Sequence, residues 1–272
     1  MKITREQVQQ FKTQGYTVVK DFFNEQEILA MRADLERLRR EGKFNNVRTE
    51  GDSKTVSQQK ANLQICPLYP KSELFRALPF KQEVLDTIPQ LIGDPVILHL
   101  DQVFLKPARH GTGTNWHQDN AYFKIPDPFL GTAMWIAVHD ATIANGTIRL
   151  IPDLAKEKLE HVKDPESNHH IRCYPPEEKA VYAEVPAGGV VFFCYGVPHA
   201  TGANNTDKDR AGVAYHFLNG VCYTEEYKQT FKPIGTVLSG KGYSAGEKEY
   251  GFKPSWTAEC EKALAGQLAA AK

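Results

Sequence analysis

From residue 95 onward, the hydrophobic positions fall into short runs separated by polar or turn residues. The runs predict strands at 96–106, 131–140, 147–151, 181–185, 190–194 and 211–217. Gly, Pro, Asn and Asp between the runs mark tight turns. Because no helical run alternates with these strands, we expect a mainly β fold. A double-stranded β-helix, that is, a jelly roll or cupin-like barrel, fits the pattern better than an α/β fold.

The N-terminal third has hydrophobic residues at helical spacing instead. Within residues 26–40, apolar side chains recur every three or four positions, at Ile28, Met31, Leu35 and Leu38. Thr4 and Asn24 each precede Gln or Glu by three positions, which is the capping-box spacing, so we expect helices to begin there. A strand over 15–19 would lie between them. We expect the second helix to buttress the outside of the barrel.

Two polar segments interrupt these patterns. Residues 44–60 are rich in Gly, Ser, Asn and Gln, which predicts a long loop or a partly mobile lid. Residues 153–179 form a polar insertion in which His169 and His170 have no spaced partner, so we expect both to face solvent. The Ala-rich tail from 255 to 271 predicts a further helix, buttressing the barrel from the C-terminal side.

Length and composition favour one domain. The 272 residues are 41% hydrophobic, enough for one large core. We expect a helical support over about 1–94, a barrel core over about 95–220 and a C-terminal extension over 221–272. The 33 basic and 33 acidic residues balance, so nothing favours nucleic acid or an acidic membrane as a partner.

The remaining composition bears on compartment and assembly. The first residues are charged too early for a signal peptide, and no apolar run approaches membrane length, so we expect a cytoplasmic protein. The five cysteines are widely spaced and form no Cys-x-x-Cys pair, so we expect reduced thiols, with Cys194 packed in the core. A monomer and a homodimer both remain open, because an exposed strand edge cannot be seen in a sequence.

Two histidines and one aspartate carry the candidate chemistry. A Trp-His-Gln-Asp run ends at Asp119, and His199 follows the strand predicted at 190–194. Side chains at i and i+2 of a strand share a face, so His117 and Asp119 can reach one ion while Gln118 turns away. We expect His199 in the loop after its strand. Such a set can hold Fe(II) on three adjacent faces and leave positions open for a cosubstrate and O2.

An arginine extends this pattern. With nine His and 33 acidic residues in the chain, a chance His-x-Asp is common, so the motif alone is weak. Thr201 and Arg210, however, follow His199 in order. An arginine on a core strand is costly unless it meets an anion, and its planar fork suits a carboxylate. The ordered set therefore predicts a metal site beside an anion site.

These residues resemble the phytanoyl-CoA dioxygenase family of iron(II)- and 2-oxoglutarate-dependent oxygenases. The matching segments are 102–107, 116–119, 135–138, 145–147 with 151–152, and 199–202 with Asn204 and Arg210. They run in the family's order through a stretch from Asp101 to Phe217 that covers nearly half of the chain. One segment departs from the pattern: after Pro152 the chain reads Asp-Leu-Ala where members commonly have Gly-Ser-His, which puts the substrate side in doubt rather than the iron.

The resemblance implies a role for each matching residue. His117, Asp119 and His199 would be the iron ligands. Arg210 would pair with the distal carboxylate of 2-oxoglutarate, and Thr201 would donate its hydroxyl to the same group. Further positions that line the cosubstrate in the family match Gln118, Trp135 and Gln102. For Trp135, ordinary core packing is the alternative, although Ala133 and Ala137 on the same strand face would leave a hollow beside its ring.

The resemblance also implies a reaction. A dioxygenase of this kind oxidises a small organic molecule while 2-oxoglutarate loses CO2 and becomes succinate. Halogenating relatives have a small residue in place of the carboxylate ligand, so Asp119 argues for hydroxylation, or else for desaturation, ring formation or peroxide insertion. Tyr122 and Phe123, next to the metal ligands, could stack on a substrate ring or plug the mouth of the barrel. A substrate from secondary metabolism is our working hypothesis.

Two other classes of function stay open. A hydrolase or isomerase on a cupin-like barrel could use the same three ligands with zinc or manganese, although Arg210 and Thr201 would then have no evident task. A non-catalytic binding barrel is the other alternative.

Overall fold

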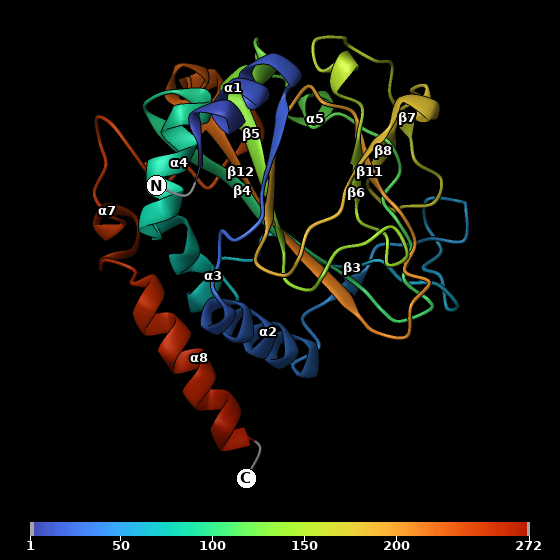
Figure 1. Ribbon diagram of the computed structural model, residues 1–272, viewed down its shortest axis with the longest axis horizontal. Helices are drawn as coiled ribbons and strands as arrows, with labels where there is room; N and C mark the ends of the chain where they lie inside the picture. The colour runs from blue at the N-terminus through green and yellow to red at the C-terminus, as the bar shows by residue number, and fades with distance from the viewer. Residues whose placement is uncertain (1–2, 271–272) are drawn as a thin grey trace.

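The computed structural model describes residues 3–270 of the chain, with side chains to residue 267. Its strands form a seven-stranded antiparallel sheet of order β1-β10-β5-β12-β4-β3-β2, a three-stranded antiparallel sheet of order β11-β6-β9, and a β7-β8 hairpin. The small sheet and the hairpin lie on one side of the large sheet, and most helices lie on the other (Figure 1). The mainly β jelly-roll fold is confirmed, with open sheets rather than a closed barrel.

Each strand has the following bounds. The large sheet consists of β1 (Tyr16–Val19), β10 (Val190–Cys194), β5 (Gly131–Ala137), β12 (Arg210–Asn219), β4 (Val96–Lys106), β3 (Leu63–Ile65) and β2 (Asn45–Asn46). The small sheet consists of β11 (His199–Thr201), β6 (Ile148–Leu150) and β9 (Val181–Ala183), and the hairpin of β7 (Val162–Lys163) and β8 (Ile171–Arg172). All six strands predicted after residue 95 occur, two of them with the predicted bounds, whereas the strand expected over 131–140 ends at Ala137.

The helices gather around the large sheet. The α-helices are α1 (Arg5–Gln14), α2 (Glu25–Arg40), α3 (Glu73–Ala77), α4 (Gln82–Ile92), α5 (Asn120–Phe123), α6 (Glu225–Phe231), α7 (Glu247–Tyr250) and α8 (Trp256–Ala270). Short 3-10 turns are η1 (Leu78–Phe80), η2 (Pro128–Leu130), η3 (Pro152–Leu154), η4 (Glu177–Lys179) and η5 (Gly220–Cys222). The predicted C-terminal helix is α8, while the last residue of that prediction, Ala271, lies outside the described residues.

The first two helices begin where the capping pattern predicted. The Thr4 side chain accepts from the backbone N–H of Gln7, whose side chain accepts from the backbone N–H of Thr4. Asn24 and Glu27 make the same reciprocal pair at the start of α2. Two otherwise unpaired N–H groups are thereby satisfied at each helix start. The Arg32 Nε of α2 also donates to the Val138 carbonyl at 2.9 Å, so α2 buttresses the end of β5 as expected.

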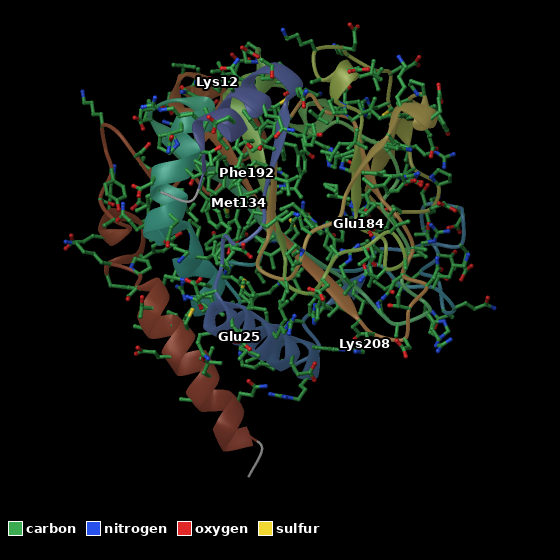
Figure 2. The ribbon with its side chains drawn as sticks, viewed as in Figure 1. Lys12, Glu25, Met134, Glu184, Phe192 and Lys208 are labelled. Carbon is green, nitrogen blue, oxygen red and sulfur yellow. The ribbon has the colours of Figure 1, made fainter. Side chains whose placement is uncertain are left out.

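Strand alternation divides the large sheet into two faces. Met134 on β5 pairs with Phe192 on β10, and both side chains are buried in the core toward the helices (Figure 2). The intervening residues on these strands face the opposite way, toward the small sheet. Lys12, Glu25, Glu184 and Lys208, labelled in the same view, are exposed (Figure 2). One face of the sheet therefore carries the helix-covered core, and the other is available to line a cavity.

Apart from the two-residue strand β2, the polar segment predicted as a loop or lid is a loop that packs on the insertion. Arg48 forms an ion pair with Glu166 at 2.7 Å, and Thr49 Oγ1 donates to the Pro165 carbonyl at 2.7 Å. The expectation that His169 and His170 both face solvent is wrong for His170, which is buried. Long-range contacts of this kind leave no local pattern in the sequence.

None of the helices between residues 3 and 270 has the length and apolar character needed to cross a bilayer. The five cysteines are free, and Cys194 packs in the core as expected.

Candidate functional site

Two histidines and an aspartate converge between the two sheets. His117, Asp119 and His199 each offer one ligand atom, and these atoms all lie within 4.8 Å of one another. The Nε2 atoms of both histidines are 3.7 Å from Asp119 Oδ1. Among the residues that the structure describes, this is the only group of three or more such side chains. The ordered motif of the sequence is thus one site in space.

The local geometry of the site differs from the prediction in two respects. Backbone hydrogen bonds of 3.0 and 2.9 Å join His117 and His199 in an isolated β-bridge. His199 begins the short strand β11, so its predicted loop position is wrong. Asp119 has helical backbone angles and occupies the N-cap position of α5 without a side-chain capping bond, so it shares no strand with His117. A tight turn, rather than strand alternation, directs the carboxylate to the two imidazoles.

Backbone carbonyls set the orientation of both imidazoles. His117 Nδ1 lies 2.8 Å from the Asn115 carbonyl, and His199 Nδ1 lies 3.0 Å from the Val197 carbonyl. Because a carbonyl only accepts, each Nδ1 carries the proton and each Nε2 presents a lone pair to the centre. Burial lowers the pKa of His117 to about 4 and that of His199 well below its usual value, so both rings are neutral. Neutral imidazoles are the form that binds metals.

No lysine or arginine in the described part of the chain pairs with Asp119. Burial raises the pKa of Asp119 to about 8, and its Oδ2 has no hydrogen-bond partner among the described residues. A divalent cation would supply the missing charge and favour the ionised carboxylate. Two neutral imidazoles and one carboxylate are the donor set of a non-haem Fe(II) centre, so the residues present fit that metal.

A pair of buried basic residues lies at one end of the same cavity. Arg210 and Lys106 sit opposite each other on β12 and β4, and both are fully buried. Neither forms an ion pair with an acidic residue in the described part of the chain. Arg210 donates to the carbonyls of Asn145 and Gly146, while its Nη1 has no partner. Burial lowers the pKa of Arg210 to about 10, so it stays charged at neutral pH and would bind an anion.

Thr201 and Trp135 line the cavity with these cations. The Thr201 hydroxyl oxygen accepts from the Thr114 N–H at 3.0 Å, so its own proton is free to donate. The Arg210 Cζ lies 5.6 Å from the centre of the Trp135 ring. Trp135 therefore faces the cavity and does not belong only to the core. Four residues that the sequence pattern predicted for the cosubstrate side face this cavity: Gln102, Trp135, Thr201 and Arg210.

Gln118 is directed elsewhere. Its amide nitrogen donates to the carbonyls of Glu157 and Gly196, each at 2.6 Å, and its amide oxygen accepts from the Leu159 N–H at 3.0 Å. The side chain thus ties a neighbouring loop to the site. The structure does not bring it to the cavity as the family pattern implied.

Sequence reasoning missed three polar residues of the site, which are Lys106, His216 and Gln64. His216 Nδ1 lies 3.5 Å from Asp119 Oδ2, and its Nε2 lies 3.2 Å from the amide nitrogen of Gln102. Gln64 donates to the Gln102 carbonyl oxygen at 2.9 Å. Strand alternation could have found His216 and Lys106, since they lie six positions after Arg210 and four after Gln102, respectively, on the same strand faces.

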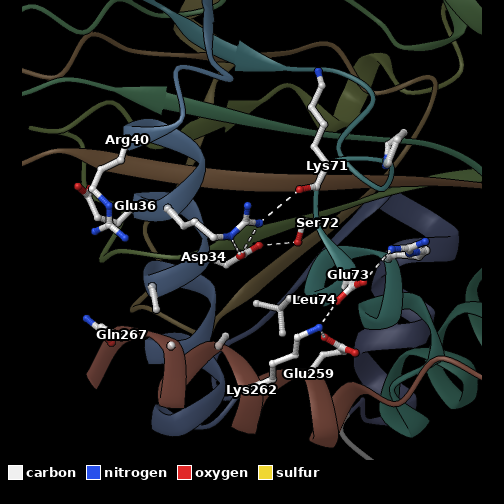
Figure 3. A pocket seen from close by; sticks show the side chains of 16 residues that line it. Asp34, Glu36, Arg40, Lys71, Ser72, Glu73, Leu74, Glu259, Lys262 and Gln267 are labelled. Carbon is white, nitrogen blue, oxygen red and sulfur yellow. Dashed lines mark hydrogen bonds and ion pairs between the residues drawn. The ribbon is translucent and has the colours of Figure 1, made fainter. Parts of the chain in front are cut away.

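The site occupies a cavity of about 200 Å³ between the two sheets. A wider groove of about 560 Å³ lies between α2, α3 and α8 (Figure 3). Several of its charged groups pair, since Asp34 bonds Arg37 and Ser72 and Glu73 pairs with Lys262 (Figure 3), and none of its described side chains has a buried polar atom without a partner. The groove therefore offers no unsatisfied chemistry comparable with that of the smaller cavity.

Comparisons with known proteins agree on the kind of protein. A family model described as "Phytanoyl-CoA dioxygenase (PhyH)" matches residues 11–212. Ectoine dioxygenase of Stutzerimonas stutzeri is 24% identical over 234 residues, covering 78% of this chain and 76% of its own. Peroxisomal phytanoyl-CoA dioxygenase of Mus musculus is 25% identical over 269 residues, covering 92% of this chain and 78% of its own.

Solved structures show the same fold. The α-ketoglutarate-dependent carbocyclase SnoK of nogalamycin biosynthesis superposes with a TM-score of 0.68 at 19% identity, covering 80% of this chain and 85% of its own. EctD of S. alaskensis, solved with bound Fe, gives a TM-score of 0.63 at 20% identity, covering 81% of this chain and 78% of its own. EvdO2 of Micromonospora carbonacea var. aurantiaca, complexed with 2-oxoglutarate, gives a TM-score of 0.63 at 20% identity, covering 80% of this chain and 91% of its own.

Proposed function

The chain belongs to the phytanoyl-CoA dioxygenase family, as its motifs predicted, and from this premise we propose that it is an iron(II)- and 2-oxoglutarate-dependent dioxygenase that hydroxylates a small organic metabolite. The substrate, the hydroxylation outcome and the roles of individual residues belong to the proposal. So do a single domain, a cytoplasmic location, a place in secondary metabolism and a monomeric or homodimeric state.

One observation carries the proposal. A single cavity holds a two-histidine, one-carboxylate cluster and, beside it, two fully buried basic side chains without an acidic partner, of which Arg210 stays charged while burial and Arg210 lower the pKa of Lys106 well below its usual value. A dicarboxylic keto acid has the matching chemistry, because one end can chelate a metal while the other end pairs with a cation. A hydrolase would need the metal cluster but would leave Arg210 and Lys106 unexplained. The cations therefore favour the oxygenase.

In this proposal His117, Asp119 and His199 would hold the iron, with two imidazole nitrogens and one carboxylate as the donor groups. When bound, iron and 2-oxoglutarate supply the activation of O2, and 2-oxoglutarate leaves as succinate and CO2. The protein orients the participants and excludes water, so no side-chain general base is needed.

The residues at the cation end would orient the cosubstrate. Arg210 would donate its unpartnered Nη1–H to the distal carboxylate, and Thr201 would donate its hydroxyl proton. The Trp135 ring lies against the guanidinium and shields this pair from water, which strengthens the charge-assisted bonds. Gln102 would instead act near the metal, because its amide nitrogen contacts Nε2 of His216. Asp119 retains the ligand that halogenating relatives lack, which supports oxygen insertion over halogenation.

The first test is anaerobic titration of Fe(II) and 2-oxoglutarate, monitored by visible absorbance. We expect a weak metal-to-ligand charge-transfer band in wild-type protein. The band should vanish in His199→Ala and should require at least about tenfold more 2-oxoglutarate in Arg210→Ala, which loses a charge-assisted bond. His110→Ala, at an exposed histidine, is the matched control and should behave like wild type. If well-folded wild type binds iron without forming the band, a hydrolase or a non-catalytic binding barrel becomes the better interpretation.

A further inference from the structure

Resting on the proposed function, we infer that the substrate is an uncharged, ring-containing small molecule that bears hydroxyl or carbonyl groups. It would occupy the aromatic-lined part of the cavity, which runs along β4 from Leu100, opposite His216, to Phe104, two residues before Lys106. We call this part the substrate compartment and define it by six lining residues: Leu100, Phe104, Tyr122, Phe123, His170 and His216.

Strand register separates the two ends of the cavity. Arg210 pairs with Lys106 at one end of the β12–β4 ladder, and His216 pairs with Leu100 further along it. The metal cluster lies near the second end, where His216 Nδ1 is 3.5 Å from Asp119 Oδ2. A cosubstrate reaching from Arg210 to the metal fills the first end. The substrate must then approach the metal from the His216 side.

The substrate compartment contains no charged side chain that is free to pair. Along the whole described cavity wall, the basic residues are Lys106 and Arg210, and the acidic residue is Asp119. Asp119 and Arg210 are committed to the metal and the cosubstrate, and Lys106 Nζ donates to the carbonyls of Gly146 and Gly202. Transferring a carboxylate, phosphate or ammonium from water into such surroundings is costly without a counter-charge. The compartment therefore discriminates against charged substrates, including the polyanionic carrier of an acyl-CoA.

Flat rings form the walls of the substrate compartment. The Phe104 and His170 rings lie 5.8 Å apart between centres, and Phe123 meets His216 edge-on at 5.2 Å. Tyr122 meets His117 at 5.9 Å in a T-shaped arrangement, and its hydroxyl accepts from the Ile171 N–H at 2.8 Å, which fixes the ring. Aromatic walls of this kind bind rings by stacking or edge contacts.

Neutral polar groups complete the substrate compartment. His170 Nδ1 bonds the Ser167 hydroxyl at 2.9 Å, and burial holds the pKa of His170 well below its usual value, so its Nε2 stays a neutral hydrogen-bonding group. Nearby, Gln64 uses its amide nitrogen on Gln102 and keeps its carbonyl oxygen for another partner. Such groups suit hydroxyl and carbonyl substituents on a ring.

The test uses matched sets of small ring compounds on the anaerobic Fe(II)–2-oxoglutarate protein. Benzyl alcohol, benzoate and benzylamine form one set, and cyclohexanol, cyclohexanecarboxylate and cyclohexylamine form another, with acetyl-CoA added. The readout is the shift of the charge-transfer band. We expect the neutral members to bind at least about tenfold more tightly than their charged twins, and acetyl-CoA to cause no shift.

A variant that adds a positive charge to the substrate compartment makes the test more specific. Phe104→Arg should invert the order, so that each carboxylate binds better than its alcohol, while Phe252→Arg, at an exposed position, should keep the wild-type order. Tighter binding of charged twins or of acetyl-CoA by wild type would overturn the inference, and so would a band that no neutral ring shifts. Loss of the band itself in wild type would instead count against the proposed function. If Phe104→Arg fails to form the band, the wild-type series alone decides.

Discussion

The indole ring of Trp135 fills the space that a side chain at residue 212 would need. A Cβ atom built on Gly212 would lie 2.7 Å from two carbon atoms of that ring, well inside van der Waals contact. Gly212 lies between Arg210 and Ala214 on the cavity face of β12. The missing side chain therefore leaves room for the indole beside the guanidinium of Arg210.

This packing predicts the effect of Gly212→Ala. The ring must move, because backbone on both strands holds the two positions in register. We expect the Michaelis constant for 2-oxoglutarate, measured by succinate formation, to rise at least about tenfold, and the free energy of unfolding to fall by about 1–3 kcal/mol. Iron affinity should change little, since the metal cluster lies beyond this contact.

Gly266→Ala provides the matched control. Gly266 lies on α8, where a Cβ would meet nothing within 4 Å, so alanine should be neutral or slightly stabilising. An unchanged Michaelis constant in folded Gly212→Ala would contradict the role given to the Trp135 ring.

A second prediction concerns His216 and the metal. His216 Nδ1 and Asp119 Oδ2 are both buried without another partner, and they lie 3.5 Å apart. We expect His216 to hold the carboxylate in its metal-binding orientation. His216→Phe should weaken Fe(II) binding by about 10–100-fold, measured by competition with a chromogenic chelator. His216→Asn keeps a donor and should recover part of the affinity, whereas equal affinity in all three proteins would rule this role out.

The strands were predictable where local signals bound them. Pro95 and Pro107 flank β4, and turn residues flank β10, so the predicted and observed limits agree. The ordered motif also identified the metal cluster, since side-chain types and their order can be read from the sequence without any knowledge of geometry. Alternation from Arg210 would further have reached His216, had it been followed along the strand.

Other features depend on partners remote in sequence. The strand of His199 is three residues long and exists because β6 pairs with it, which no local periodicity reveals. The turn at Asp119 leads into a four-residue helix, too short to show a helical pattern. His170 is buried in an insertion whose residues Pro165 and Glu166 bond the distant residues Thr49 and Arg48. Register and loop packing therefore needed the structure.

A third prediction uses the pH dependence of stability. Asp101 is fully buried, accepts from the Leu68 N–H at 2.9 Å and leaves Oδ2 without a partner. Burial raises the pKa of Asp101 to about 7. The folded state therefore holds this proton more tightly than the unfolded chain, and the stability it contributes below about pH 4 is lost as the pH rises through about 7.

Comparison with Asp101→Asn isolates this effect, because the amide keeps an acceptor but does not titrate. The stability of wild type relative to the variant should fall between pH 4 and 7, by at most about 1.4 kcal/mol per pH unit. Urea unfolding of metal-free protein at several pH values measures the difference. A constant difference across this range would show that Asp101 does not bind the proton in the folded state.

A fourth prediction concerns the attachment of the C-terminal helix. Glu27 Oε1 accepts from Lys81 Nζ at 2.6 Å and from the Trp256 indole at 2.5 Å, while Oε2 accepts from the Asn24 N–H at 2.8 Å. One carboxylate thus joins the start of α2, the start of α4 and the start of α8.

Glu27→Ala would leave the Trp256 indole N–H without its acceptor, while the Lys81 ammonium would keep its ion pair with Glu83 at 2.9 Å. Since a buried donor left without its acceptor is costly, we expect the free energy of unfolding to fall by about 1–3 kcal/mol, measured by urea titration with tryptophan fluorescence. Glu25→Ala changes an exposed glutamate two residues before Glu27, and its free energy of unfolding should stay within about 0.5 kcal/mol of that of wild type. Because Glu27 lies on the helix side of the large sheet, folded Glu27→Ala should still form the iron–2-oxoglutarate band. Loss of the band at full folding would mean that the helical support also shapes the metal cavity.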